Sequence, residues 1–229
     1  MAISFTTTDQ AARLNGVKVL VYGGAGMGKT VLVSTAPAPL LISAEGGELS
    51  LRGFQIPMVK VKTVEDIQQI YHWLTTDPNS QQFQTVCIDS LSEIAEVVLN
   101  NAKRQVKDPR QAYGELMEKM ESVIRLFRDL PGRNVYMSAK MEPSKDELTG
   151  IVRYGPSMPG SKLGAKLPYF FDEVFRLGVN KTPQGEQYRF LQTQPDLQYE
   201  AKDRSGALDA MEPPNLTHIF QKIAGRTAA

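Results

Sequence analysis

The chain has few of the residues that disulfide-bonded proteins and common metal sites need. Cys87 is its one cysteine, and there are two histidines among 229 residues. A single thiol excludes an internal disulfide and a cysteine-rich metal site. Its place within the apolar segment 86–88 predicts a small buried side chain. His72 and His218 fall in separate predicted helices, so they predict no metal cluster.

Long apolar runs and a strong net charge are missing as well. No segment approaches the roughly 18 apolar residues of a membrane helix. Residues 1–6 lack the basic-then-apolar pattern of a secretory signal, so we expect a cytoplasmic protein with no membrane partner. The 26 Lys and Arg residues nearly balance the 25 Asp and Glu residues, giving a formal charge of +1. Nucleic-acid binding would therefore have to rest on local basic clusters.

Length and composition are those of an ordinary globular protein. The chain is 41% hydrophobic and 22% charged, which is typical of a soluble domain with a sizeable core. We expect a single α/β domain over residues 1–229. Residues 1–15 are interpreted as a polar lead-in that packs on the edge of the domain, and residues 224–229 as a flexible tail.

A glycine-rich stretch carries the strongest signal in the sequence. Gly23, Gly28, Lys29 and Thr30 complete the pattern G-x-x-x-x-G-K-[ST]. The pattern follows an apolar strand at 17–22 and precedes a short helix that Pro37 ends, which is the context a phosphate loop requires. Glycines let the backbone N–H groups surround phosphate oxygens. The predicted nucleotide-binding residues are Gly23, Gly24, Ala25, Gly26, Met27, Gly28, Lys29 and Thr30.

Within that loop, Lys29 is predicted to reach the β- and γ-phosphates of ATP, and the Thr30 hydroxyl to bind Mg²⁺. A glycine-rich turn without a ligand is the alternative interpretation.

Apolar strands and amphipathic helices alternate along the rest of the chain. Strands are predicted at 40–44, 57–61, 83–88, 134–138, 170–179 and 187–192, and helices at 63–74, from Ser90 or Ser92, at 111–130 and at 215–223. The alternation predicts an α/β fold with a mostly parallel twisted sheet and helices on both faces. Residues 141–166 show little periodicity, and we expect a long functional loop there.

Two carboxylates follow predicted strands, where ligands of such sheets bind. Asp89 closes an apolar strand and is the natural Walker B aspartate, holding Mg²⁺ opposite Thr30. A helix cap or turn residue is its alternative role, and the two roles can coexist. Glu45 lies beside two glycines and could orient and deprotonate the attacking water. A solvated turn glutamate is the alternative.

This pattern resembles the RecA-like P-loop ATPases. In that group the catalytic glutamate lies on the strand after the phosphate-loop helix, here 41–45, and a polar sensor ends a later strand, here Ser138 in 138–140. The resemblance places a first DNA-binding loop at 103–113 and a second at 141–166. More closely, residues 15–225 look like phage-encoded nucleotide-binding proteins that are shortened RecA-like recombinases assisting single-strand annealing.

The same resemblance gives a role to Lys202 and Arg204. Their K-x-R spacing is found in RecA-like ring ATPases, where the two cations reach a neighbouring subunit's γ-phosphate. Alternation in an extended segment would point both side chains the same way, and the planar guanidinium of arginine suits a phosphate. The resemblance therefore implies a homo-oligomer, either a ring or a filament. Two solvated charges in a late loop are the alternative.

Two basic clusters are candidates for contact with single-stranded DNA, which binds to cationic tracks interleaved with aromatic rings. Solvated charge is the alternative for either cluster alone. The first cluster, near Tyr113, comprises Lys103, Arg104, Lys107 and Arg110. The second, near Tyr169 and Phe170, comprises Lys145, Arg153, Tyr154, Lys162 and Lys166.

The sequence thus predicts a Mg²⁺-dependent ATPase that binds single-stranded DNA as an oligomer and promotes phage recombination or annealing. A single-strand-binding protein is a further expected partner. The main alternative is a nucleotide-gated binding module with little turnover, acting as a loader or clamp. A small-molecule kinase is a third option, which leaves Glu45 and the K-x-R pair without a role.

Overall fold

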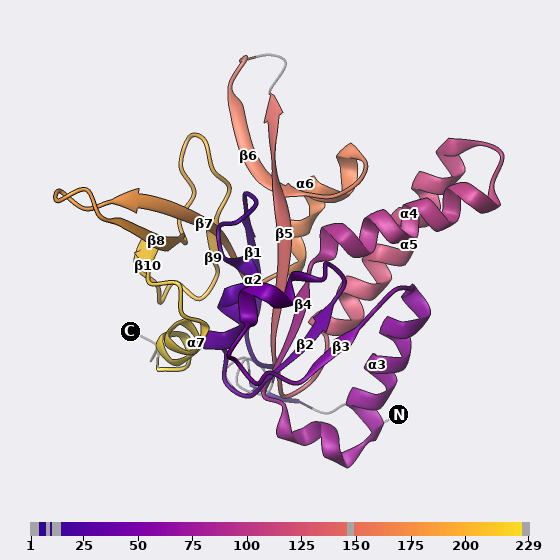
Figure 1. The fold of residues 1–229 in the computed structure, drawn as a ribbon, viewed down its shortest axis with the longest axis horizontal. Coiled ribbons are helices and arrows are strands. Elements are labelled where there is room, and N and C mark those ends of the chain that lie inside the picture. Colours follow the sequence, from indigo (N-terminus) through magenta and orange to yellow (C-terminus); the bar gives the residue numbers. More distant parts are fainter. Residues whose placement is uncertain (1–4, 8–9, 11–14, 146–148, 226–229) are drawn as a thin grey trace.

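A mostly parallel sheet forms the centre of the molecule (Figure 1). The computed structural model describes residues 5–7, 10, 15–145 and 149–225, so the predicted lead-in and tail lie largely outside the described residues. The strands are β1 Lys18–Gly23, β2 Pro39–Ser43, β3 Met58–Lys60, β4 Thr85–Asp89, β5 Asn134–Lys145, β6 Val152–Ser157, β7 Glu173–Lys181, β8 Gln187–Gln192, β9 Lys202–Asp203 and β10 Met211–Glu212.

Strand order puts the phosphate-loop strand in the middle of the sheet. The order is β10-β8-β7-β1-β5-β4-β2-β3, with β6 paired to β5 and β9 paired to β7. The run from β7 to β3 is parallel, whereas β6, β8, β9 and β10 pair antiparallel. This arrangement confirms the predicted α/β fold with a mostly parallel sheet.

Helices cover both faces of the sheet. The helices are α2 Lys29–Leu32, α3 Val64–Thr76, α4 Leu91–Gln105, α5 Pro109–Arg128, α6 Ser161–Phe170 and α7 Leu216–Ala224, with 3₁₀ turns η1 Val33–Thr35, η2 Gly47–Leu51 and η3 Pro78–Gln82. In β1, Leu20 and Tyr22 pack into the core under α3 to α6, and Val19 and Val21 face α2 and α7. Burial on both faces explains the unbroken apolar sequence of β1. Among the described residues, no helix is long and apolar enough to span a membrane.

Local capping chemistry sets two of the predicted helix starts. The Thr63 side chain accepts a hydrogen bond from the Asp66 N–H, and Asp66 accepts in return from Thr63, which completes a capping box at the start of α3. Ser90 is the N-cap of α4. Both helices begin where the sequence predicted because these side chains satisfy N–H groups that have no partner within the helix.

The predicted long loop at 141–166 is wrong. Strand β5 continues to Lys145, β6 returns antiparallel to it, and α6 begins at Ser161. The hairpin projects beyond the rest of the sheet (Figure 1). Pro143 and Pro156 interrupt the alternation that marks a strand in sequence, but an outer hairpin tolerates proline where no N–H is needed. The predicted strand start at Phe170 is also wrong, because that residue ends α6.

A close backbone approach at Gly16 fixes the entry into β1. Gly16 has φ +65°, and a Cβ built on it would lie 2.4 Å from the Arg133 carbonyl oxygen. Gly132 has a similar φ of +70° with nothing within 4 Å of its Cβ position. An alanine at either position would suffer the same unfavourable backbone conformation, but only an alanine at position 16 would also clash with a neighbour. Comparing the two substitutions therefore separates these two costs.

We expect Gly16→Ala to lower the free energy of unfolding by more than Gly132→Ala does. A left-handed alanine costs about 1–2 kcal/mol, and Gly16→Ala must also push the Arg133 backbone away. Urea unfolding of the two variants beside the wild type measures the difference. Equal losses in both variants would show that the 16–133 contact relaxes freely.

Candidate functional site

The glycine-rich segment connects the end of β1 to the start of α2, the strand–loop–helix context that the sequence predicted. Of the eight residues predicted to bind nucleotide, Gly23 ends β1 and Lys29 and Thr30 begin α2. Gly26 and Gly28 have φ of +71° and +102°, conformations that favour glycine. The Lys29 ammonium donates to the carbonyl oxygens of Gly23 and Gly24, at 2.8 and 3.0 Å. The Lys29 ammonium thus lies within the loop. In this position the ammonium and the backbone N–H groups of the loop could bind the same phosphate oxygens.

Asp89 joins this loop to the middle of the sheet. Its side chain is buried, and its Oδ2 accepts from the Thr30 hydroxyl at 2.6 Å. Its Oδ1 accepts from the buried Ser138 hydroxyl on the neighbouring strand β5. Thr30 and Asp89 therefore place adjacent oxygen atoms of the kind that Mg²⁺ prefers as ligands, and Ser138, the predicted sensor, contacts the same carboxylate.

Glu45 lies in the turn after β2, beside Asp89 in space. The exposed Glu45 carboxylate accepts through Oε1 from the Ser90 hydroxyl at 2.5 Å. The turn needs its glycines, because Gly46 has φ +72° and a Cβ on Gly47 would lie 3.3 Å from Thr30 Oγ1. Close passage of this turn over Thr30 brings the predicted base to the edge of the phosphate loop.

Several of these groups affect the pKa of Lys29. Burial lowers the pKa of Lys29, the carboxylates of Glu45 and Asp89 raise it, and the Lys140 ammonium lowers it. The buried Tyr136 hydroxyl donates to the Lys29 carbonyl at 2.7 Å and so holds the start of α2 on the sheet. Burial is the largest of the effects on Lys29, so the pKa of Lys29 is lowered on balance.

Sequence reasoning missed a functional candidate in Lys140. Lys140 is exposed, pairs in register with Gly23, and forms an ion pair with Glu93 on α4. That ion pair raises the pKa of Lys140. The only signal in sequence was its place two residues after Ser138.

A hydrogen-bonded path leads from Lys140 to the projecting hairpin. The Lys140 backbone N–H donates to the Ser92 hydroxyl at 2.9 Å, and that hydroxyl donates to the Ser157 carbonyl at 2.7 Å. Ser92 lies at the start of α4, two residues after Ser90. The Ser92 hydroxyl therefore joins α4 to both strands of the hairpin at its base, where Lys140 pairs with Ser157.

The first basic cluster lies at the tip of the α4–α5 helical hairpin. Lys103, Arg104, Lys107 and Arg110 are all exposed there. The Lys103 ammonium lies over the Tyr113 ring, 5.5 Å from its centroid, and this ring is itself 39% exposed. The tip extends away from the sheet (Figure 1), so these cations face solvent.

The second cluster is divided between the β5–β6 hairpin and α6. Lys145 and Arg153 are exposed on the hairpin, and Lys162 is exposed on α6. Lys166 pairs with Glu121 of α5 at 2.8 Å. The Tyr154 ring is stacked on Tyr199 with centroids 5.3 Å apart, so one of its faces is already covered.

The start of α6 lies close to the aromatic ring of the first cluster. Gly160, at the start of α6, lies against the Tyr113 ring, since a Cβ built on Gly160 would be 3.2 Å from that ring. Glycine at this position permits the contact and also supplies φ +82°. The start of α6, two residues before the exposed Lys162, therefore lies against the ring that Lys103 covers.

The K-x-R pair lies at the opposite end of the sheet. Strand β9 pairs with the start of β7, and Lys202 and Arg204 both point toward the turn between α6 and β7. Lys202 donates to the carbonyl oxygens of Pro168 and Phe171, at 2.9 and 2.5 Å. Arg204 pairs with Asp172 at 2.9 Å.

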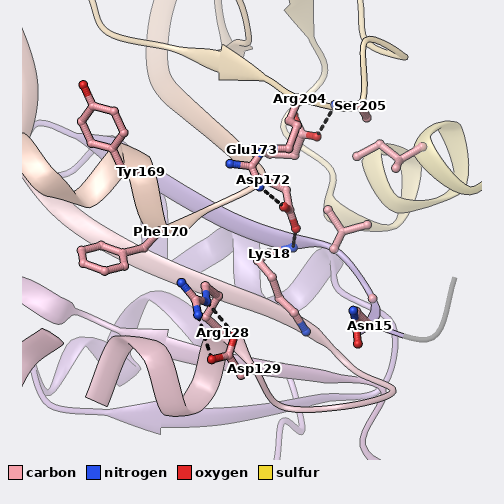
Figure 2. A pocket seen from close by; sticks show the side chains of 13 residues that line it. Asn15, Lys18, Arg128, Asp129, Tyr169, Phe170, Asp172, Glu173, Arg204 and Ser205 are labelled. Atoms are coloured by element: carbon pink, nitrogen blue, oxygen red, sulfur yellow. Dashed lines mark hydrogen bonds and ion pairs between the residues drawn. The ribbon is translucent and has the colours of Figure 1, made fainter. Parts of the chain in front are cut away.

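Arg204 lines a cavity of about 660 Å³ at the amino ends of β1 and β7 (Figure 2). Lys18, Arg128 and Glu173 are other charged residues of its lining. Burial lowers the pKa of Lys18 to about 8, and the Lys18 ammonium donates to the carbonyl oxygens of Leu130 and Arg133. The wall of this cavity thus carries the exposed Arg204 together with the buried Lys18 and Glu173.

Glu173 makes the stability of this region depend on pH. Burial, which is the larger effect, and the nearby Asp203 carboxylate together raise its pKa from 4.5 to about 8. Between these two values the unfolded chain has lost a proton that the folded chain retains, so stability falls as pH rises from 4.5 to 8. Glu173→Gln removes this titration.

We expect the free energy of unfolding to decrease from pH 5 to pH 8 in the wild type relative to Glu173→Gln. The difference should be a few kcal/mol, at about 1.4 kcal/mol for each tenfold change in proton affinity. Denaturant unfolding at several pH values measures it, with the exposed Glu186→Gln as control. Parallel pH profiles for wild type and Glu173→Gln would contradict the assignment.

Comparisons with known proteins identify the family. The sequence matches the family described as "AAA domain" over residues 15–205, which include the phosphate loop, Asp89 and Ser138. The fold is similar to that of a KaiC-like protein from the hyperthermophilic archaeon Pyrococcus horikoshii, with a TM-score of 0.46 and 16% sequence identity over 77% of each chain. The search of curated proteins found no match. The chain belongs to the AAA domain family and is a P-loop ATPase.

Proposed function

We propose that this protein is a Mg²⁺-dependent ATPase that binds single-stranded DNA as an oligomer and promotes phage recombination by single-strand annealing. The observation that carries the ATPase part is the hydrogen-bonded series Thr30–Asp89–Ser138, with Glu45 held beside it by Ser90. The observation that favours DNA is the group of exposed cations at the α4–α5 tip around the partly exposed Tyr113 ring, against which Gly160 of the α6 start lies.

In the proposed reaction the phosphate loop binds the triphosphate through its N–H groups and Lys29. Lys29 leaves the carbonyl oxygens of Gly23 and Gly24 and pairs with phosphate oxygens. Thr30 and Asp89 would hold Mg²⁺, which neutralises charge on the phosphates. Glu45 keeps Oε1 on the Ser90 hydroxyl and accepts a proton from water through Oε2. The water oxygen bonds to the γ-phosphorus while the bond to the bridging oxygen breaks, which releases ADP and phosphate.

The distance between the K-x-R pair and the phosphate loop supports an oligomer. Strand β9 pairs with residue 173, which lies in register with Val19, four residues before Gly23. Arg204 is one residue further along, level with Asp172 and Lys18, so at about 3.3 Å per residue it lies on the order of 16 Å from its own loop. Arg204 could therefore act on the nucleotide of a neighbouring protomer, once it leaves Asp172 or shares that carboxylate.

The basic surface of the α4–α5 tip supports DNA binding through phosphates and rings. Exposed cations on the α4–α5 tip flank Tyr113, and Lys103 leaves much of that ring accessible. Base stacking on an aromatic face with cations alongside is the usual form of single-strand binding without sequence preference. A net charge of +1 gives modest affinity per protomer, and association of protomers on one strand would raise it through avidity.

Glu45→Gln is expected to retain ATP binding and to lower ATP turnover by about 10²–10⁴-fold, the usual contribution of a general base. The measurement is phosphate release with and without single-stranded DNA over a range of protein concentrations. Glu48→Gln, three residues along the same turn, is the control. Its carboxylate pairs with Lys60 at 2.9 Å, and it should keep wild-type turnover.

Unchanged turnover in Glu45→Gln, or tight ATP binding without turnover in the wild type, would contradict the proposed enzyme. Either result would favour the nucleotide-gated binding module. Specific activity that rises with protein concentration is the expected sign of a site shared between protomers.

Removing two cations from the α4–α5 tip should weaken single-stranded DNA binding and reduce its salt dependence. Each phosphate contact contributes about 0.7 to the slope of log K against log salt, so Lys107→Ala with Arg110→Ala should lower the slope by about 1.4. Fluorescence anisotropy of a labelled oligonucleotide from low to moderate salt measures this. Lys62→Ala with Lys181→Ala removes the same charge elsewhere on the surface.

The DNA part of the proposal fails if the wild type shows no salt-dependent binding to oligonucleotides, with or without ATP. An equal loss in both double variants would mean that only total charge matters and that the tip is not the binding surface.

A further inference from the structure

The β7–β8 hairpin lies against the phosphate loop. Strand β7 follows β1 in parallel, and a Cβ built on Gly23 would lie 3.1 Å from the Leu177 carbonyl oxygen. Leu177 pairs with Leu191 of β8, and both belong to the core that contains Leu32 of α2. The face of the hairpin that carries these leucines therefore faces α2.

Register then decides which β8 side chain extends over the loop. Opposite residues of an antiparallel pair share a face, and residues two apart along a strand return to it. Phe190 packs on the other face, and its ring covers Gly178. A Cβ built on Gly178 would lie 2.6 Å from Cζ of Phe190. Arg189 thus shares the face of Leu191, two residues nearer the outer end of the hairpin.

Arg189 is in contact with the phosphate loop itself. A Cβ built on Gly28 would lie 3.5 Å from Arg189 Nε and 3.6 Å from its Cδ. The side chain is exposed, and within the described part of the chain no hydrogen bond or ion pair engages its guanidinium. A free cation therefore lies beside the glycine whose neighbouring N–H groups begin α2.

We propose that Arg189 is a nucleotide-binding residue of the same protomer, which lies beside the end of the phosphate loop and binds phosphate oxygens of the bound nucleoside triphosphate. This inference rests on the proposed use of the phosphate loop for ATP. Lys29 contacts Gly23 and Gly24 at the start of the loop, whereas Arg189 lies beside Gly28 at its end. Cations at both ends of the loop would then bind the phosphates, and the planar guanidinium can donate two parallel hydrogen bonds to them.

The position of the hairpin gives Arg189 a different role from Arg204. Arg204 lies at the amino end of the sheet, remote from its own loop, whereas Arg189 contacts that loop within one chain. Arg189 should therefore affect nucleotide binding by isolated protomers, at protein concentrations where Arg204 has no neighbour to act upon.

The test is the affinity of full-length Arg189→Ala for ATP, inorganic triphosphate and adenosine, measured by calorimetry with Mg²⁺ at dilute protein. We expect Kd for ATP and for triphosphate to rise by about tenfold, the scale of one charge-assisted hydrogen bond, with adenosine unaffected. Arg189→Lys should recover part of the loss. Lys62→Ala is the matched control for charge, and thermal unfolding without ligand checks that each variant folds.

Wild-type affinity for ATP in Arg189→Ala would overturn the inference and leave the proposed ATPase intact. Weaker binding of ATP and adenosine with unchanged triphosphate binding would also overturn it, since the arginine would then contact the base. Failure of the wild type to bind ATP, with Lys29→Ala no different, would overturn both proposals.

Discussion

The buried carboxylate of Asp89 is the constraint on which the rest of the site depends. An unpaired carboxylate at this depth would cost several kcal/mol, and Asp89 avoids that cost by accepting from Thr30 and Ser138. These partners fix the start of α2 and the middle of β5 relative to β4. Because β5 continues from Ser138 into the projecting hairpin, the same carboxylate also sets where that hairpin begins.

Chemistry is divided between the two ends of the sheet. The carboxyl ends of β1, β2 and β4 bring together Lys29, Glu45 and Asp89, whereas Arg204 and the buried Glu173 lie at the amino ends. In a parallel sheet all strands begin at one edge and end at the other. Residues at the start of a strand are therefore separated from residues at its end by the full length of the strand. A site that needs both ends must be completed by a second molecule, which is the physical basis of the proposed oligomer.

Ser92 offers a route by which nucleotide chemistry could reach the basic surface. Its hydroxyl joins the Lys140 backbone to the Ser157 carbonyl, and α4, which it begins, leads to the Lys103 tip. Lys140 is also close enough to Lys29 to lower its pKa. A shift of Lys29 toward phosphate would therefore change the electrostatic environment of the strand that supports the hairpin.

Local sequence was enough to predict the phosphate loop, the alternation of strands and helices, the caps at Thr63 and Ser90, and Asp89 at the end of a strand, because each depends on residues close together in the chain. It did not reveal the β5–β6 hairpin, since Pro143 and Pro156 hide the strand alternation, and it gave no reason to single out Arg189. The positions of β8 beside the loop, of Glu45 at Ser90 and of Tyr113 at Gly160 became evident only in the folded chain. Those contacts join residues from 45 to 161 positions apart, and packing of the sheet, which local sequence patterns do not encode, brings them together.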